Sequence, residues 1–161
     1  MINKLTSILI LMLLVGCSTS KSEYIYTAKN NDPHLEFSSD FGNKTKPPVH
    51  FSLNIIDPDS NKCEDFKEIG YYYPESSIFI FAEANPELSA KVPANKYVSI
   101  ESHYNIGNAE YCYAETLQFL AEEAKNYNVI FKMKNDICNL EIIDNENLKP
   151  VRVKPKRQCI R

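Results

Sequence analysis

The stretch YNVIFKMK, residues 127–134, alternates side chains of two kinds, and CNLEI, residues 138–142, repeats the alternation. Tyr127, Val129, Phe131 and Met133 fall on one side, and the residues between them fall on the other. Successive side chains of a β-strand point to opposite faces of its sheet, so a period of two indicates strands with one buried face. We therefore predict two half-buried strands in this part of the chain.

Similar signals recur toward both ends of the chain. His50–Ile55 places Phe51, Leu53 and Ile55 on one face and is bounded by Pro47-Pro48 and Asp57-Pro58-Asp59. Ile78 to Ala82 is continuously apolar, which is typical of a central strand buried on both faces. The remaining predicted strands are Tyr97–His103 with Val98 and Ile100 inward, Tyr111–Leu120, and a closing strand through Val151 and Val153.

The segment ETLQFLAEEAK, residues 115–125, also fits a short helix. Its apolar residues at 117, 120, 121 and 124 have a helical spacing. The alternative is a strand through Phe119 followed by a tight turn. We favour the strand because the predicted neighbours on both sides are strands.

The composition favours an all-β protein. Ten Tyr and eight Phe are typical of strands with one face in water, and the 161 residues suit a single domain. Many short strands separated by Pro and Asn turns predict one antiparallel β-sandwich, of a transthyretin- or immunoglobulin-like kind.

The N-terminus resembles the type II signal peptide of bacterial lipoproteins. Lys4 precedes an apolar run that ends in Leu14-Val15-Gly16-Cys17, a lipobox, and the run is shorter than the roughly 20 residues of a membrane-spanning helix. The resemblance implies that residues 1–16 are removed and that Cys17 is lipidated. Ser18, in place of Asp, implies the outer membrane, with the domain facing the periplasm.

This organisation predicts three parts of the chain. They are the signal peptide 1–16, a lipidated N-terminus with a flexible tether over 17–32, and a β-sandwich domain over 33–161 with a basic C-terminal segment. Fifteen extended tether residues would span up to about 50 Å. The alternative is that Tyr24 and Tyr26 already belong to a first strand, which would shorten the tether.

The body of the chain resembles small bacterial lipoproteins with a transthyretin- or immunoglobulin-like sandwich. The resemblance covers residues 78–143 and depends on Val92-Pro93-Ala94 and on Ala124-Lys125-Asn126-Tyr127-Asn128-Val129, each leading into a strand. Ala124 stands where that pattern usually has Gly.

Cys17 aside, the chain has four cysteines, an even number that predicts two disulfides in an exported domain. Three connectivities are open, and we favour Cys63–Cys112 with Cys138–Cys159. The second bond would hold the basic tail to the body. No Cys-x-x-Cys pair exists, and His34, His50 and His103 lack ligand-like spacing, so we predict no metal and no cofactor.

Charge is distributed unevenly, although the chain carries only −3 overall. Residues 147–161 contain basic residues and no acid, and all acidic residues precede them. We predict that residues 147–161 form either an edge strand beside the acidic body of the domain or a contact with lipid phosphates. The acidic total argues against nucleic acid as a partner.

Three clusters are candidate sites. Tyr71 and Tyr73 are candidates for an aromatic surface that binds a glycan or peptide. The alternative, which we favour, is that Tyr72 packs inward while Tyr71 and Tyr73 cover the sheet. Residues 57–68 place oxygen ligands as an EF-hand loop does, but Lys62 replaces the required Gly, so we favour a solvated loop over calcium binding. Glu101 and His103 share a strand face, which we interpret as a surface pair.

No catalytic motif is recognisable, since neither G-x-S-x-G nor a glycine-rich phosphate loop is present. We predict a lipid-anchored, non-enzymatic binding or structural module with a protein or envelope component as partner. The alternatives are a periplasmic inhibitor or immunity protein that neutralises a toxin or lytic enzyme, and an envelope hydrolase with a site assembled from distant residues. Lysozyme-inhibitor lipoproteins are comparable in size, but their Ser-Gly and Tyr-Trp segments are absent here.

Overall fold

The computed structural model describes residues 21–42, 47–56, 65–73, 87–106, 110–116 and 118–154. Within these ranges every regular element is a β-strand, and no helix is long and apolar enough to cross a membrane. The strands are β1 (His34–Asp40), β2 (Val49–Ile56), β3 (Lys67–Tyr72), β4 (Ser89–Lys91), β5 (Lys96–Ile106), β6 (Glu110–Glu115), β7 (Phe119–Ala121), β8 (Asn126–Lys134), β9 (Ile137–Asp144) and β10 (Lys149–Pro150).

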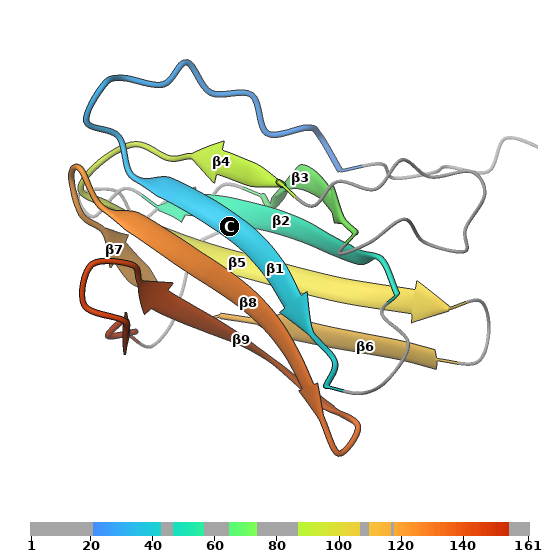
Figure 1. Cartoon of the computed structure of the whole chain (residues 1–161). Coiled ribbons are helices and arrows are strands. Elements are labelled where there is room, and N and C mark those ends of the chain that lie inside the picture. The colour runs from blue at the N-terminus through green and yellow to red at the C-terminus, as the bar shows by residue number, and fades with distance from the viewer. Residues whose placement is uncertain are drawn as a thin grey trace, which may run out of the picture.

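The strands form two sheets that pack face to face (Figure 1). The β2 sheet has the order β3-β2-β5-β6, with β7 also paired to β5, and the β8 sheet has the order β10-β9-β8-β1-β4. The predicted all-β sandwich is confirmed. One pairing departs from the antiparallel expectation, because β1 and β8 run parallel. Parallel neighbours need a long connection, and most of the domain lies between these two strands in sequence.

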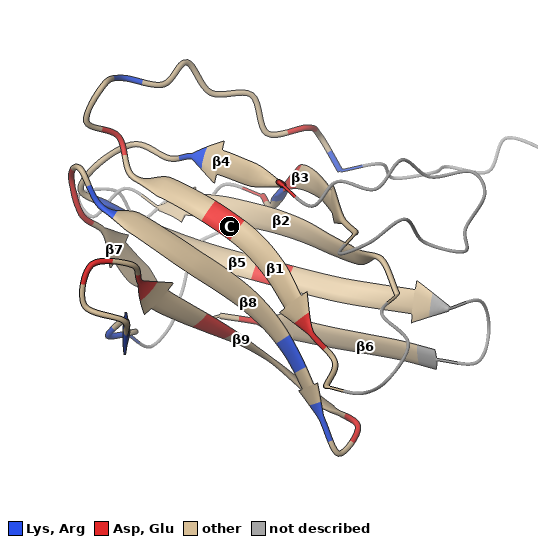
Figure 2. Ribbon diagram, in the orientation of Figure 1, with Lys and Arg blue, Asp and Glu red and all other residues tan. Residues whose placement is uncertain are grey.

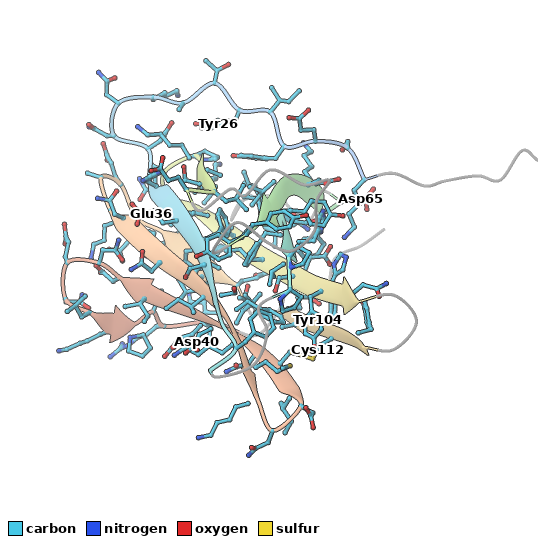
Figure 3. All side chains as sticks on the ribbon, turned by 45° about the vertical axis from the view of Figure 1, so that its right-hand side comes forward. Tyr26, Glu36, Asp40, Asp65, Tyr104 and Cys112 are labelled. Carbon is cyan, nitrogen blue, oxygen red and sulfur yellow. A yellow bond between two sulfur atoms is a disulfide. The ribbon has the colours of Figure 1, made fainter. Side chains whose placement is uncertain are left out.

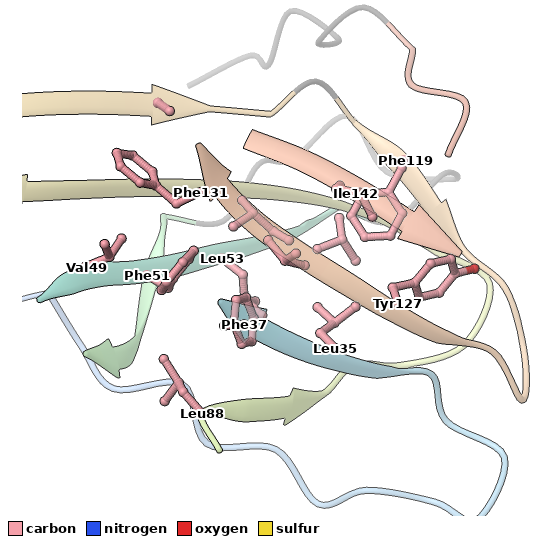
Figure 4. Packing of buried hydrophobic residues seen from close by; sticks show 14 of the residues in the cluster. Leu35, Phe37, Val49, Phe51, Leu53, Leu88, Phe119, Tyr127, Phe131 and Ile142 are labelled. Atoms are coloured by element: carbon pink, nitrogen blue, oxygen red, sulfur yellow. The ribbon is translucent and has the colours of Figure 1, made fainter. Parts of the chain in front are cut away.

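The core lies between the sheets and contains the residues that the alternation predicts to be inward (Figure 4). Each such ring or branched side chain contributes about 1.5–3 kcal/mol on full burial. The predicted inward residues that are almost fully buried are Phe51, Leu53, Val98, Ile100, Tyr127, Val129, Phe131 and Ile142.

The ambiguous segment 115–125 contains a strand, as we favoured. β6 ends at Glu115, and β7 continues beside the first residues of β5. Between β6 and β7, Thr116 forms two hydrogen bonds with Ile100 of β5. The N–H of Thr116 donates to the carbonyl of Ile100 at 2.7 Å, and the N–H of Ile100 donates to the hydroxyl of Thr116 at 2.8 Å. The turn after β7 contains Ala124 at φ 59°, a conformation that favours Gly.

The disulfide links Cys112 to Cys138, so both pairings that we favoured, Cys63–Cys112 and Cys138–Cys159, are wrong. Cys112 lies on β6 of the β2 sheet (Figure 3) and Cys138 on β9 of the β8 sheet, with Cα atoms 6.1 Å apart. The bond therefore joins the two sheets. Sequence spacing missed it because the pairing depends on how the sheets stack.

Several predictions fall on residues outside the described ranges. These are the lipobox and Cys17, Cys63 and Cys159, the strand Ile78 to Ala82, and residues 57–64 of the calcium-like loop. The predicted closing strand through Val151 and Val153 is wrong. β10 covers only Lys149–Pro150, both valines lie beyond it, and Val153 is exposed.

Residues 22–24 lie against the domain, in a segment that the sequence had predicted to be a flexible tether. The N–H of Tyr24 donates to the carbonyl of Glu68 at 2.7 Å, and the N–H of Glu68 donates to the carbonyl of Ser22 at 2.9 Å. The Tyr24 hydroxyl also donates to the carbonyl of Lys91, at 2.9 Å. The domain thus extends N-terminally beyond residue 33.

Replacing both Cys112 and Cys138 by Ala should lower the free energy of unfolding by about 3 to 4 kcal/mol, because the bond restricts the unfolded chain. Denaturant titration of the oxidised parent and the double variant measures this loss. The control is Cys112→Ser/Cys138→Ser, which removes the same bond with other side chains and should match the Ala variant. Equal midpoints for the oxidised parent and the variant would contradict the bond.

Candidate functional site

The outer face of the β2 sheet gathers His and Tyr side chains from four strands. Antiparallel registers place His50 beside Tyr71 of β3 on one side and beside His103 of β5 on the other. His103 in turn pairs with Tyr113 of β6. Because inward neighbours such as Phe51 enter the core, these side chains must face outward.

Five rings form a continuous line across this face, which we call the aromatic row: Tyr73, Tyr71, His50, His103 and Tyr111. Successive ring centroids are 6.3, 4.8, 4.7 and 6.0 Å apart. Neighbouring rings are tilted by 37° to 61°, so the row is not a single flat plane. These distances lie in the range of favourable ring contacts.

The row is buried at its centre and open on both sides. His50 is only 6% exposed, whereas Tyr71 is 47% exposed and Tyr111 is 64% exposed. Tyr113, beside the row on β6, is 43% exposed. The exposed rings of this face are therefore tyrosines, and His50 between them is buried.

The carboxylates of this face are engaged by neighbouring side chains. Glu68 lies 3.0 Å from Nε2 of His50, and Glu101 forms an ion pair with Lys21. The hydroxyl of Tyr113 lies 3.0 Å from the other Glu101 oxygen. Burial together with the charge of Glu115 raises the pKa of Tyr113 to about 12, so its hydroxyl keeps its proton and donates.

Burial lowers the pKa of His50, although the neighbouring Glu68 partly opposes the shift. Burial and the charge of His50 likewise lower the pKa of His103. His50 is therefore neutral at neutral pH and carries its proton on Nε2, toward Glu68. Its Nδ1 is buried and has no hydrogen-bond partner among the described residues.

The structure brings the predicted pair Tyr71 and Tyr73 together with partners that sequence reasoning missed. His50 and His103 lie far apart in sequence, and only the β2–β5 register joins them. The one sequence signal for His50 and His103 was that each occupies an outward position in an alternating strand. Glu101 and His103 do share a face, but the predicted surface pair is wrong: Glu101 is only 7% exposed and bonds Lys21 and Tyr113.

No metal site is formed by the residues that the structure describes, in which no group of three or more His, Cys, Asp or Glu could hold an ion. Glu68, the last residue of the calcium-like pattern, lies in β3 and pairs with His50. Of the other oxygen ligands of that pattern, Asp65 lies two residues before β3 and is exposed, whereas Asp57, Asp59 and Asn61 lie outside the described ranges.

The basic C-terminal segment lines a separate groove of about 390 Å³ with Tyr97 and Tyr127. Lys154 donates to the Tyr97 hydroxyl at 2.7 Å, and Lys125 forms an ion pair with Asp144 at 2.7 Å. Lys149 and Arg152 are exposed. Two basic side chains of the groove, Lys154 and Lys125, are therefore bonded to other side chains of the domain, and two others, Lys149 and Arg152, are exposed.

No protein-family model and no curated protein matches this chain. Among solved structures, the fold is similar to a crystal structure described as a "putative cell adhesion protein" from Bacteroides ovatus ATCC 8483, at 11% identity and a TM-score of 0.37. The similarity covers 80% of this chain and 45% of that one, so this chain spans less than half of it. The function must therefore be argued from the site itself.

Lowering the pH from about 7 to about 5 should reduce the stability of the domain. The lowered pKa values of His50 and His103 mean that the unfolded chain binds more protons in this window. Stability is therefore highest above the unfolded pKa and is lost as the pH falls toward the folded values.

The double variant His50→Gln/His103→Gln should flatten this pH dependence, as measured by thermal unfolding across the window. His34→Gln is the control, since His34 lies on β1 of the other sheet. A slope equally steep in the double variant and in the parent would contradict the assignment.

Proposed function

We propose that this protein is a lipid-anchored, non-enzymatic module of the bacterial envelope that acts by contact through its aromatic row. In this proposal, Cys17 carries the lipid and holds the domain at the outer membrane, on its periplasmic side. The exposed tyrosines bind an envelope component, and the sandwich serves as a rigid support for them.

The observation that carries the proposal is the exposure of Tyr71, Tyr111 and Tyr113 on one sheet face. Tyrosine is enriched at binding surfaces because its large ring buries much area and loses little rotamer freedom. A contiguous aromatic patch on a soluble domain is typical of an interaction site. The strands hold these rings at fixed positions, which lowers the entropic cost of binding.

The polar groups of the face favour contact over catalysis. A hydrolase of the serine type needs a nucleophile within hydrogen-bond reach of its base. Ser52 lies on the same face as His50, yet its hydroxyl has no hydrogen-bond partner within the part of the chain that the structure describes. The carboxylates of Glu68 and Glu101 are already bound to His50 and Lys21.

Loss of the lipid should release the protein from membranes. The test variant carries Cys17→Ala behind an ordinary cleavable signal peptide, and fractionation after a high-salt wash measures its distribution. We expect the parent in the membrane fraction and the variant in the soluble periplasmic fraction. Retention of the variant at high salt would contradict a lipid anchor at Cys17.

Contact through the aromatic row predicts that Tyr71→Ala and Tyr111→Ala weaken binding to the envelope severalfold. Co-sedimentation of the soluble Cys17→Ala domain with purified envelope fragments measures this binding. Leu148→Ala is the matched control, because Leu148 is 75% exposed and lies in the turn after β9. Equal loss in all three variants, or no loss in the tyrosine variants, would contradict the proposed surface.

A further inference from the structure

We infer that the partner of the aromatic row is the surface of the bilayer that carries the lipid anchor. The inference rests on the proposed anchor at Cys17 and goes further, because it assigns an orientation: the part of the β2 sheet's outer face that exposes Tyr71, Tyr111 and Tyr113 lies on the membrane. Other outward residues of this sheet, such as Ser52 and Ser99, are buried and take no part in the contact. Three features of the described residues lead to it.

The first feature is where the N-terminal segment meets the domain. Ser22 and Tyr24 pair through their backbone with Glu68 of the edge strand β3. From this edge the Lys21 side chain reaches over the outer face to Glu101 on β5, and its ammonium also lies 5.9 Å from the centre of the Phe66 ring. The chain therefore enters the domain along the β3 edge of the sheet, with the Lys21 side chain on the outer face.

The second feature is the length of chain between the anchor and this docking point. Four peptide units join Cys17 to Lys21, and even fully extended they span at most about 14 Å. The two sheets of a sandwich are about 10 Å apart, before the side chains on either outer face are counted. A chain this short holds the β3 edge, with the neighbouring part of the outer face, near the headgroups and leaves too little length for the outer face of the β8 sheet to lie there.

The third feature is the chemistry of the face. Tyrosine is enriched at membrane–water interfaces, where the ring contacts apolar matter and the hydroxyl stays hydrated. Tyr71, Tyr111 and Tyr113 are exposed on both sides of the aromatic row. Of the neighbouring carboxylates, Glu101 forms an ion pair with Lys21, and Glu68 accepts a hydrogen bond from the neutral His50. Both contacts reduce the cost of bringing these groups to a headgroup layer.

The outer face of the β8 sheet differs in its chemistry. Charged positions lie on β1, β8 and β9 (Figure 2), among them Glu36 of β1 and the paired Lys132 of β8 and Glu141 of β9. Figure 3 labels Glu36 on the opposite side of the molecule from Asp65, which lies two residues before β3. Charged side chains are typical of a surface in water, so the tyrosine-bearing face is the better candidate for the membrane contact.

Fluorescence quenching tests the orientation, because the chain contains no Trp. Tyr111→Trp places a single reporter on the face, Tyr71→Trp is a second reporter on another strand, and Glu36→Trp is the control on the opposite face. The acylated full-length proteins are reconstituted in phosphatidylethanolamine–phosphatidylglycerol vesicles, with and without phospholipid brominated near the headgroup. Thermal unfolding checks that each variant is folded.

We expect emission from Tyr111→Trp and Tyr71→Trp to be quenched severalfold more strongly than emission from Glu36→Trp. Intact-mass measurement and vesicle flotation report separately on the anchor. Acylated protein that floats with vesicles but shows equal quenching in all variants would overturn the orientation and leave the proposed module standing. Protein without acyl chains that fails to float would overturn both.

Discussion

The register between β2 and β5 is the constraint on which the rest of the structure depends. It pairs Leu53 with Ile100 on the core side and His50 with His103 on the outer side. A slip of one residue would expose the first pair and bury the second, since side chains alternate between faces. The same seven-residue pairing therefore determines both the hydrophobic core and the assembly of the aromatic row.

The two sheets are held together by apolar packing and by one covalent bond in the described part of the chain. Phe51 of the β2 sheet and Phe131 of the β8 sheet are fully buried in the same core cluster. At one margin, the Cys112–Cys138 bond joins β6 to β9. A domain of this length can bury a sufficient core without crosslinks, so the bond reinforces the stacking of sheets that the core already specifies.

The outer faces of the two sheets differ in the side chains that they carry. The outer face of the β8 sheet carries charged residues such as Lys132 and Glu141, which are typical of a solvated surface. The β2 sheet carries exposed tyrosines, beside Glu101 in an ion pair with Lys21 and Glu68 in a hydrogen bond with His50. Docking of residues 21–24 along the β3 edge, with Lys21 over this second face, couples the direction of the N-terminus to the surface that we propose for binding. Anchoring and recognition would then occur on the same side of the domain.

The sequence alone determined the strand character, the inward residues and the all-β class, because a period of two is a local property of the backbone. It also identified Tyr71 and Tyr73 as surface candidates. The parallel pairing of β1 with β8, the Cys112–Cys138 bond and the meeting of His50 with His103 were decided by the tertiary structure. Each joins residues from separate strands, and their proximity depends on register and sheet stacking, which spacing along the chain does not encode.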